Sequence, residues 1–193
     1  MKPILMTILA AAFAINAAAQ EINISISPTI NNPLHLRFVS GGPNYNWKPG
    51  LNASLGYHFK TDNKINMVVE LTYQKATVEV DPFIAPQDDP PPFNESMNLL
   101  SFSVGACYNF TKGYYATINP LIHYQLDYQD GNSITKQTGI GISGGFGKKF
   151  NLNSNLLINV GPKIWIHNLV PFQEENLPSR LTAVGINVGL IFK

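Results

Sequence analysis

Apolar and polar residues alternate one by one along most of the chain after residue 20. The final segment shows this most clearly, because its two faces differ in size and polarity. One face holds Thr182, Val184, Ile186, Val188, Leu190 and Phe192, and the other holds Ala183, Gly185, Asn187 and Gly189. A period of two predicts a β-strand. Since the second face is small rather than charged, we expect the apolar face to meet lipid and the small face to meet a crowded interior.

The same alternation recurs in seven earlier segments, so eight strands are predicted. The segments are 22–30, 51–59, 65–74, 100–110, 117–127, 139–150, 156–167 and 180–193. Most of them reach the ~9–11 residues that a tilted strand needs to cross a bilayer. Pro120 and Pro162 lie inside strands, where each removes a hydrogen-bond donor, so β-bulges are predicted there. Residues 31–33 interrupt the first strand, and 34–38 are expected to be its kinked extension or a separate short strand.

The connections between these segments alternate between short and long. The short ones are 61–64, 111–113 and 151–153, and the mostly longer ones are 41–46, 81–94, 129–133 and 168–179. Aromatic residues gather at the strand ends beside the short turns: Tyr57, Phe59, Tyr108, Phe110, Tyr114, Phe146, Phe150 and Phe192. Such rings favour the membrane interface, and short turns of outer-membrane barrels face the periplasm. Both termini are therefore expected on the periplasmic side.

The N-terminus predicts a secretory signal peptide over residues 1–19. Lys2 supplies the positive charge, residues 4–15 are apolar but too few to span a bilayer, and residues 17–19 are alanines that suit cleavage. A single mature domain, 20–193, would follow. Its one cysteine, Cys107, leaves no internal disulfide and no lipoprotein cysteine after the cleavage site.

Charge and composition narrow the class of protein. Lys and Arg number 13, of which Lys2 lies in the leader, and Asp and Glu number 12, so the mature chain has zero formal charge and no nucleic-acid partner is expected. Charged residues make up 13% of the chain, about half of the ~25% typical of soluble domains. No segment after residue 20 is long and apolar enough for a membrane helix. The predicted fold is all-β: an eight-stranded antiparallel up-and-down transmembrane β-barrel in the outer membrane, in contact with its lipid.

Four segments carry a resemblance to a known family. They are 50–59 (GLNASLGYHF), 70–75 (ELTYQK), Gly161-Pro162 within a strand, and 185–192 (GINVGLIF). With the leader ending at Ala19-Gln20, the pattern resembles the PorT-like outer-membrane β-barrel family of Gram-negative bacteria. The resemblance covers the whole mature chain and implies a small barrel, few of whose relatives have a known activity. The chain ends in Lys193 rather than the usual aromatic, so Phe192 would serve as the assembly signal.

Two short motifs resemble catalytic or cofactor sites. Residues 141–145 match G-x-S-x-G around Ser143, and Gly139, Gly141 and Gly144 match G-x-G-x-x-G. Both motifs need a helix after the strand, whereas this strand continues to Phe150. We therefore interpret the small residues as space inside a narrow barrel and expect no catalytic residue, cofactor or metal; the histidines lack metal-ligand spacing.

Ionisable residues that face the lumen by phase are expected to pair with one another. They are Glu70, Lys163, His123, Asp127, His58 and His167. His123 and Asp127 lie on one predicted strand face but ~13 Å apart, since each residue advances ~3.3 Å, so they cannot form a catalytic pair directly. A structural polar network is the favoured interpretation, because buried charges need partners.

The predicted long loops are the expected interaction surface. Loop 81–94 is rich in proline and aspartate, with Asp81, Pro82, Asp88, Asp89, Pro90, Pro91 and Pro92 as candidate contacts. Proline favours a stiff, extended backbone that can present side chains to an envelope or extracellular protein. The favoured function is non-enzymatic, structural or partner-binding. Two alternatives stay open: an outer-membrane lipid-modifying enzyme, and a soluble exported barrel that binds a small ligand inside.

Overall fold

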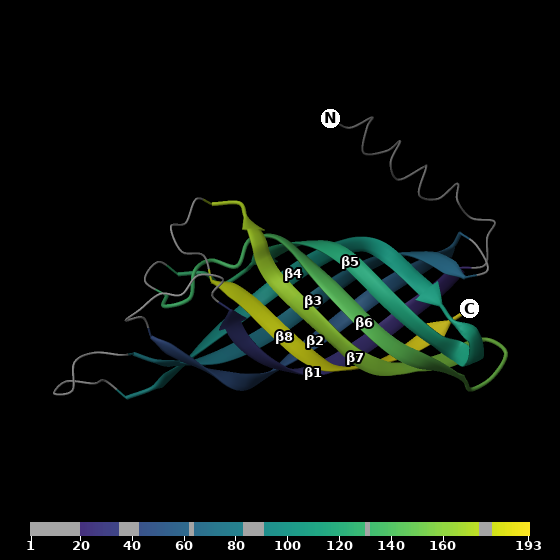
Figure 1. Ribbon diagram of the computed structural model, residues 1–193, viewed down its shortest axis with the longest axis horizontal. Helices are drawn as coiled ribbons and strands as arrows, with labels where there is room; N and C mark the ends of the chain where they lie inside the picture. The colour runs from purple at the N-terminus through teal and green to yellow at the C-terminus, as the bar shows by residue number, and fades with distance from the viewer. Residues whose placement is uncertain (1–19, 35–42, 62–63, 83–90, 130–131, 174–178) are drawn as a thin grey trace, which may run out of the picture.

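The computed structural model describes residues 20–34, 43–61, 64–82, 91–129, 132–173 and 179–193. Eight strands form one closed antiparallel barrel in chain order, and β1 pairs with β8 to complete it (Figure 1). The strands are β1 (Gln20–Leu34), β2 (Asn44–Lys60), β3 (Ile65–Asp81), β4 (Phe93–Asn109), β5 (Tyr114–Gln125), β6 (Gly139–Asn151), β7 (Leu156–Pro171) and β8 (Arg180–Phe192). The predicted eight-stranded up-and-down barrel is confirmed.

The two ends of the barrel differ. One end, called here the turn end, holds the short connections, including the 3₁₀ turn Thr111–Gly113, and the C-terminus. The opposite end, called the loop end, holds the long connections, and β2, β3 and β4 project furthest there (Figure 1). The predicted signal peptide, 1–19, and the segment 35–38 lie outside the described residues. No helix in the described part of the chain is long and apolar enough to cross a membrane.

A belt of apolar side chains covers the outside of the barrel. Leu55 is 54% exposed, Ile118 58% and Ile186 50%, while the alternate positions hold buried Asn, Ser, Thr and Gly. The outward apolar runs on β3 and β4 extend over about nine residues, which matches the length needed to cross a bilayer. A soluble ligand-binding barrel would carry its apolar face inside, so that alternative is wrong.

The polarity of β3 and β4 inverts toward the loop end. Beyond Tyr73, the outward positions of β3 become Lys75, Thr77 and Glu79, and the inward positions become Ala76, Val78 and Val80, which are fully buried. On β4, Met97 and Leu99 turn inward and Ser96 and Asn98 outward. Polar-out and apolar-in is the arrangement of a sheet in water. The inversion therefore marks the level at which the apolar belt ends.

The predicted bulges at Pro120 and Pro162 are wrong. Partner pairs on either side of Pro120 stay in one register, Ser103 with Leu121 and Ala106 with Ile118. The same holds around Pro162 and around Pro28, for which no bulge was predicted. Each proline points outward and interrupts the partner pairs on one side for two positions without shifting the strand.

Glycines let the strands approach closely beside these prolines. A Cβ added to Gly105 would collide with the Ile118 carbonyl oxygen, and one added to Gly185 would collide with that of Pro28. The missing N–H of proline is thus accommodated by close packing of backbone against backbone. Register shifts occur elsewhere, at residues 47–51 of β2 and beside Asn168 of β7, whose φ of 57° lies in the left-handed region.

Several predicted strands differ in length from those in the structure. β1 runs through residues 31–33 to Leu34, pairing Asn31 with both Lys48 and Ala183, so the expected interruption is absent. β7 continues to Pro171 and so takes in the first four residues of the predicted loop 168–179. β5 instead ends at Gln125, two residues earlier than predicted. Polar residues at these strand ends take part in backbone pairing or point into the lumen, and alternation alone does not predict either.

An arginine scan along the outer face tests where the apolar belt ends. Val188→Arg should destabilise the folded barrel by roughly 2–4 kcal/mol, because it places a charge near the middle of the belt. Thr77→Arg also faces outward but lies beyond the polarity inversion, so its cost should be about 0–1 kcal/mol. Urea unfolding in lipid vesicles measures both, and equal costs would contradict this placement of the belt.

Candidate functional site: the polar lumen and its closure

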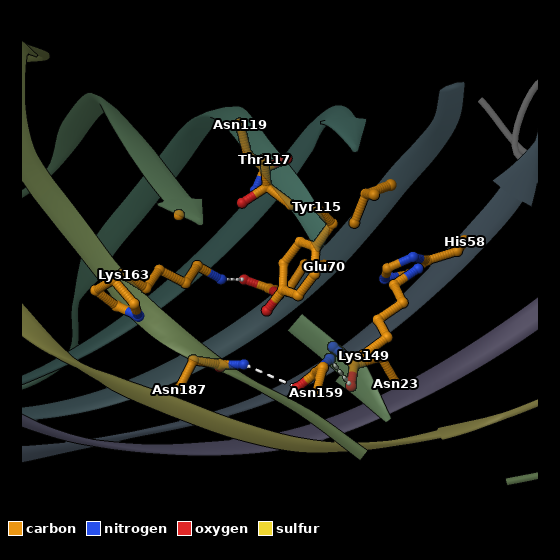
Figure 2. Close-up of a pocket in the computed structure, with 13 residues that line it drawn as sticks. Asn23, His58, Glu70, Tyr115, Thr117, Asn119, Lys149, Asn159, Lys163 and Asn187 are labelled. Atoms are coloured by element: carbon orange, nitrogen blue, oxygen red, sulfur yellow. Dashed lines mark hydrogen bonds and ion pairs between the residues drawn. The ribbon is translucent and has the colours of Figure 1, made fainter. Parts of the chain in front are cut away.

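A buried ion pair crosses the middle of the lumen. Lys163 Nζ, from β7, lies 2.7 Å from Glu70 Oε1, from β3, and the two strands are not neighbours in the sheet (Figure 2). Thr72 Oγ1 donates a further hydrogen bond of 3.1 Å to the same carboxylate oxygen. The Lys163 ammonium also lies 5.1 Å from the centre of the Trp165 ring. Both charges are buried, so each satisfies the other where water is scarce.

A chain of amides braces the wall beside this pair. Ser27 Oγ donates to Asn187 Oδ1 at 3.0 Å, Asn187 Nδ2 to Asn159 Oδ1 at 3.1 Å, and Asn159 Nδ2 to Asn23 Oδ1 at 3.2 Å. These residues come from β1, β7 and β8, which include the closing seam (Figure 2). The amide chain thus ties the first and last strands together from inside.

A second lysine lies closer to the turn end. Lys149 Nζ donates to Asn109 Oδ1 at 3.0 Å and lies 3.7 Å from Glu21 Oε2. Lys149 and His58 line a cavity of about 30 Å³ together with the Glu70–Lys163 pair (Figure 2). A space of this size holds one or two water molecules.

Two histidines meet on the loop-end side of the ion pair. His123 and His167 place their ring centres 4.8 Å apart, nearly perpendicular. His123 Nε2 accepts the backbone N–H of Asn168 at 3.0 Å, which places its ring proton on Nδ1. His167 Nε2 lies 2.8 Å from Gln74 Oε1 and therefore carries the proton of that ring. Asn168 has a left-handed backbone, with a φ of 57°, where its N–H reaches His123.

An apolar layer closes the loop end of the lumen. Ile134, from the connection between β5 and β6, is 1% exposed and packs among inward residues of β3, β4 and β8: Ala76, Val78, Met97, Leu99 and Leu181. The Glu95 carboxylate accepts the backbone N–H groups of Ser133 and Ile134 at 3.0 and 3.4 Å. This segment therefore lies inside the barrel mouth as a plug.

The plug is held from its other side by Gln137, which is fully buried. Gln137 Nε2 donates to the carbonyl oxygens of Thr135 and Ser179, and its Oε1 accepts the Leu181 N–H at 3.0 Å. Thr135 and Ser179 hydroxyls lie 2.7 Å apart. The connection is thus fixed by side chains in place of a strand ladder.

The structure brings five of the six predicted lumen residues inside: Glu70, Lys163, His58, His123 and His167 are all buried. The prediction for Asp127 is wrong. Because β5 ends at Gln125, Asp127 turns to the outer surface and accepts hydrogen bonds from Asn98 N and Nδ2 at 2.9 and 2.7 Å. Its phase was extrapolated past the end of the strand.

Residues that the sequence analysis missed include Gln74, Glu95, Ile134, Gln137 and Asn168. Gln74 was on the polar face by phase, but Ile134 and Gln137 lie outside any strand and carry no periodic signal. Asn168 and Ser179 were placed in a recognition loop, whereas both are buried and face the interior. Of the candidate loop contacts, Asp81 ends β3 and Pro82 follows it. Pro91 and Pro92 are exposed, and Asp88, Asp89 and Pro90 lie outside the described residues.

The described residues offer little support for a hydrolytic site. Ser143 is buried in the middle of β6, with no helix after it. The hydrogen bond of His123 comes from a backbone N–H, and neither a serine nor a carboxylate bonds to its ring within the described part of the chain. No three His, Cys, Asp or Glu side chains among those residues are grouped to hold a metal.

The ion pair yields a direct stability test. Glu70→Gln leaves Lys163 buried without a counter-charge and should destabilise the barrel by roughly 3–5 kcal/mol. Glu70→Leu combined with Lys163→Met removes both charges and should recover most of that loss. Glu79→Gln, in the exposed Lys48–Glu79 pair, is the control and should change little. Urea titration in detergent micelles measures all three; a silent Glu70→Gln would show that the pair is not needed.

Comparisons with known proteins agree with this architecture. Residues 5–192 match the family described as "Outer membrane protein beta-barrel domain". A comparison with curated proteins found no match.

Solved barrels share the fold at low sequence identity. Neisserial surface protein A (NspA) superposes with a TM-score of 0.54 at 14% identity, covering 89% of this chain and 96% of that one. OprG of Pseudomonas aeruginosa gives 0.55 at 14% identity, covering 91% and 95%. AlkL, solved in lipid bilayers, gives 0.50 at 8% identity, covering 91% and 90%. The chain belongs to the outer-membrane β-barrel family.

Proposed function

We propose that this protein is a closed, non-enzymatic outer-membrane barrel that acts structurally or by binding a partner at its loop end. The observation that carries the proposal is the double closure of the lumen. The Glu70–Lys163 pair fills the middle, and Ile134 with its apolar neighbours fills the loop end. An eight-stranded barrel is just wide enough for such side chains. Within the described residues these two layers obstruct the passage of solutes, so recognition falls to the outward surfaces.

The proposed orientation places the turn end in the periplasm and the loop end outside. Short turns face the periplasm in barrels of this type, and the aromatic residues Tyr108, Phe110, Tyr114 and Phe146 form a contacting girdle at this end. Both termini would then be periplasmic after cleavage of a signal peptide at residues 1–19. Within the family, segments 50–59, 70–75 and 185–192 favour the PorT-like group of Gram-negative bacteria.

The partner would be an envelope or extracellular protein that contacts the loop end. Four connections join the strands at this end, and the projecting ends of β2, β3 and β4 carry polar side chains outside. Loops on a rigid scaffold are where recognition usually resides. The acidic, proline-rich loop 81–94 remains the proposed contact, presented by the end of β3 and the start of β4.

The closed lumen should be visible in electrical recordings. The purified protein in a planar bilayer should give no steady conductance, because the ion pair and the plug leave no continuous water path. A diffusion porin in the same membrane is the positive control. A steady channel with the unmodified protein would contradict the proposed function.

Cysteine labelling tests the orientation. Cys107 is fully buried, and Cys107→Ser provides the background. In that background Ser133→Cys, exposed at the loop end, should react with a membrane-impermeant maleimide on whole cells. Ser154→Cys, exposed at the turn end, should react only after the outer membrane is opened. The reverse pattern would overturn the orientation and leave the closed lumen unaffected.

A further inference from the structure

A second, larger cavity opens at the turn end of the barrel. It has a volume of about 460 Å³, and its lining includes Lys60, Lys149, Glu21, Asn66 and Asn109. The alternation of each strand turns these side chains inward, so the barrel wall holds them around one space. Cavities that bind small molecules typically measure ~300–1,000 Å³. The space therefore suits a small organic molecule rather than a lone water.

The charges around this cavity are unbalanced. Of the ionisable side chains that line it, Lys60, Lys149 and Lys193 are cationic and only Glu21 is anionic. Deeper in the lumen, Glu70 is engaged by Lys163 at 2.7 Å. Within the described residues the Lys60 ammonium has no ion pair. An excess of positive charge inside a low-dielectric wall focuses potential on the cavity and attracts anions.

Lys149 is the residue best placed to bind an anion in this cavity. Its side chain is 12% exposed, and its ammonium offers three N–H donors. Only one hydrogen bond uses them within the described part of the chain, to Asn109 Oδ1 at 3.0 Å, and the distance of 3.7 Å to Glu21 Oε2 exceeds a hydrogen bond. A half-buried ammonium with unused donors gains from an added acceptor.

Lys149 also lines the small inner cavity, in which it lies near His58 (Figure 2). The two cavities therefore meet at this side chain. Beyond Lys149, the Glu70–Lys163 pair lines the inner cavity. A ligand would therefore reach Lys149 from the turn end.

We infer that the turn-end cavity binds a small oxyanion, a phosphate- or carboxylate-bearing molecule, between Lys60 and Lys149. The amides of Asn66 and Asn109 supply neutral polar groups beside the two ammonium groups. In the proposed orientation the anion would come from the periplasm. The binding chemistry itself does not depend on that orientation, so the two ideas can fail separately.

Calorimetric titration of the folded protein in a non-ionic detergent tests the site. The probes are inorganic phosphate and succinate, each titrated at constant ionic strength against sodium chloride. We expect saturable binding of one anion per barrel for at least one probe. Lys149→Gln and Lys60→Gln should each weaken it about tenfold or more, since each removes a charge-assisted hydrogen bond.

Lys112→Gln is the matched control. Lys112 is exposed in the turn Thr111–Gly113 at the same end but does not line the cavity, so the control should bind like the parent protein. Heat-modifiable gel mobility confirms that each variant is folded, and Lys60→Gln keeps the Lys149–Glu21 contact if Lys149→Gln fails to fold. Phosphate binding alone, succinate binding alone or binding of both identifies the anion class. Absence of saturable binding, or equal weakening by Lys112→Gln, would overturn the inference.

Discussion

The structure depends on one constraint: a backbone that crosses hydrocarbon must satisfy its hydrogen bonds within the protein. Pairing β1 with β8 meets this requirement, because the barrel then has no free edge. The same constraint explains how the strands pack around prolines, which lack a backbone N–H. Pro28, Pro120 and Pro162 each interrupt one ladder for two positions, and neighbouring glycines allow the strands to close up there without a change of register.

Closure of so few strands leaves a narrow interior, in which charged and polar side chains must find partners among themselves. Water is scarce there, so a charge survives only with a partner. Glu70 and Lys163 meet across the lumen, and histidines, amides and hydroxyls of β1, β3, β5, β7 and β8 form hydrogen bonds on either side. The lumen then changes along the axis. Lysines and Glu21 lie at the turn end, the Glu70–Lys163 pair, amides and imidazoles lie in the middle, and aliphatic side chains lie at the loop end.

Period-two alternation predicted the strand count and the closed fold. It also predicted the inward direction of Glu70, Lys163 and three histidines, His58, His123 and His167. It succeeded because each strand face meets one uniform environment within the belt. It failed where that environment ends. Asp127 lies two residues past the end of β5. Ile134 and Gln137 belong to a connection whose position is set by Glu95 of β4 and by Ser179, which precedes β8. Long-range side-chain contacts of this kind leave no local pattern to read.

The exchange of polarity on β3 and β4 has a consequence for how the barrel stays seated in its membrane. If the barrel slid toward the turn end, Lys75, Thr77 and Glu79 would enter the hydrocarbon; if it slid the other way, the belt residues up to Tyr73 would enter water. A lysine such as Lys75 would cost roughly 2–4 kcal/mol on the lipid face near the midplane. The change of polarity on these two strands therefore opposes movement in both directions. The order of a few side chains fixes the depth of the barrel in the membrane.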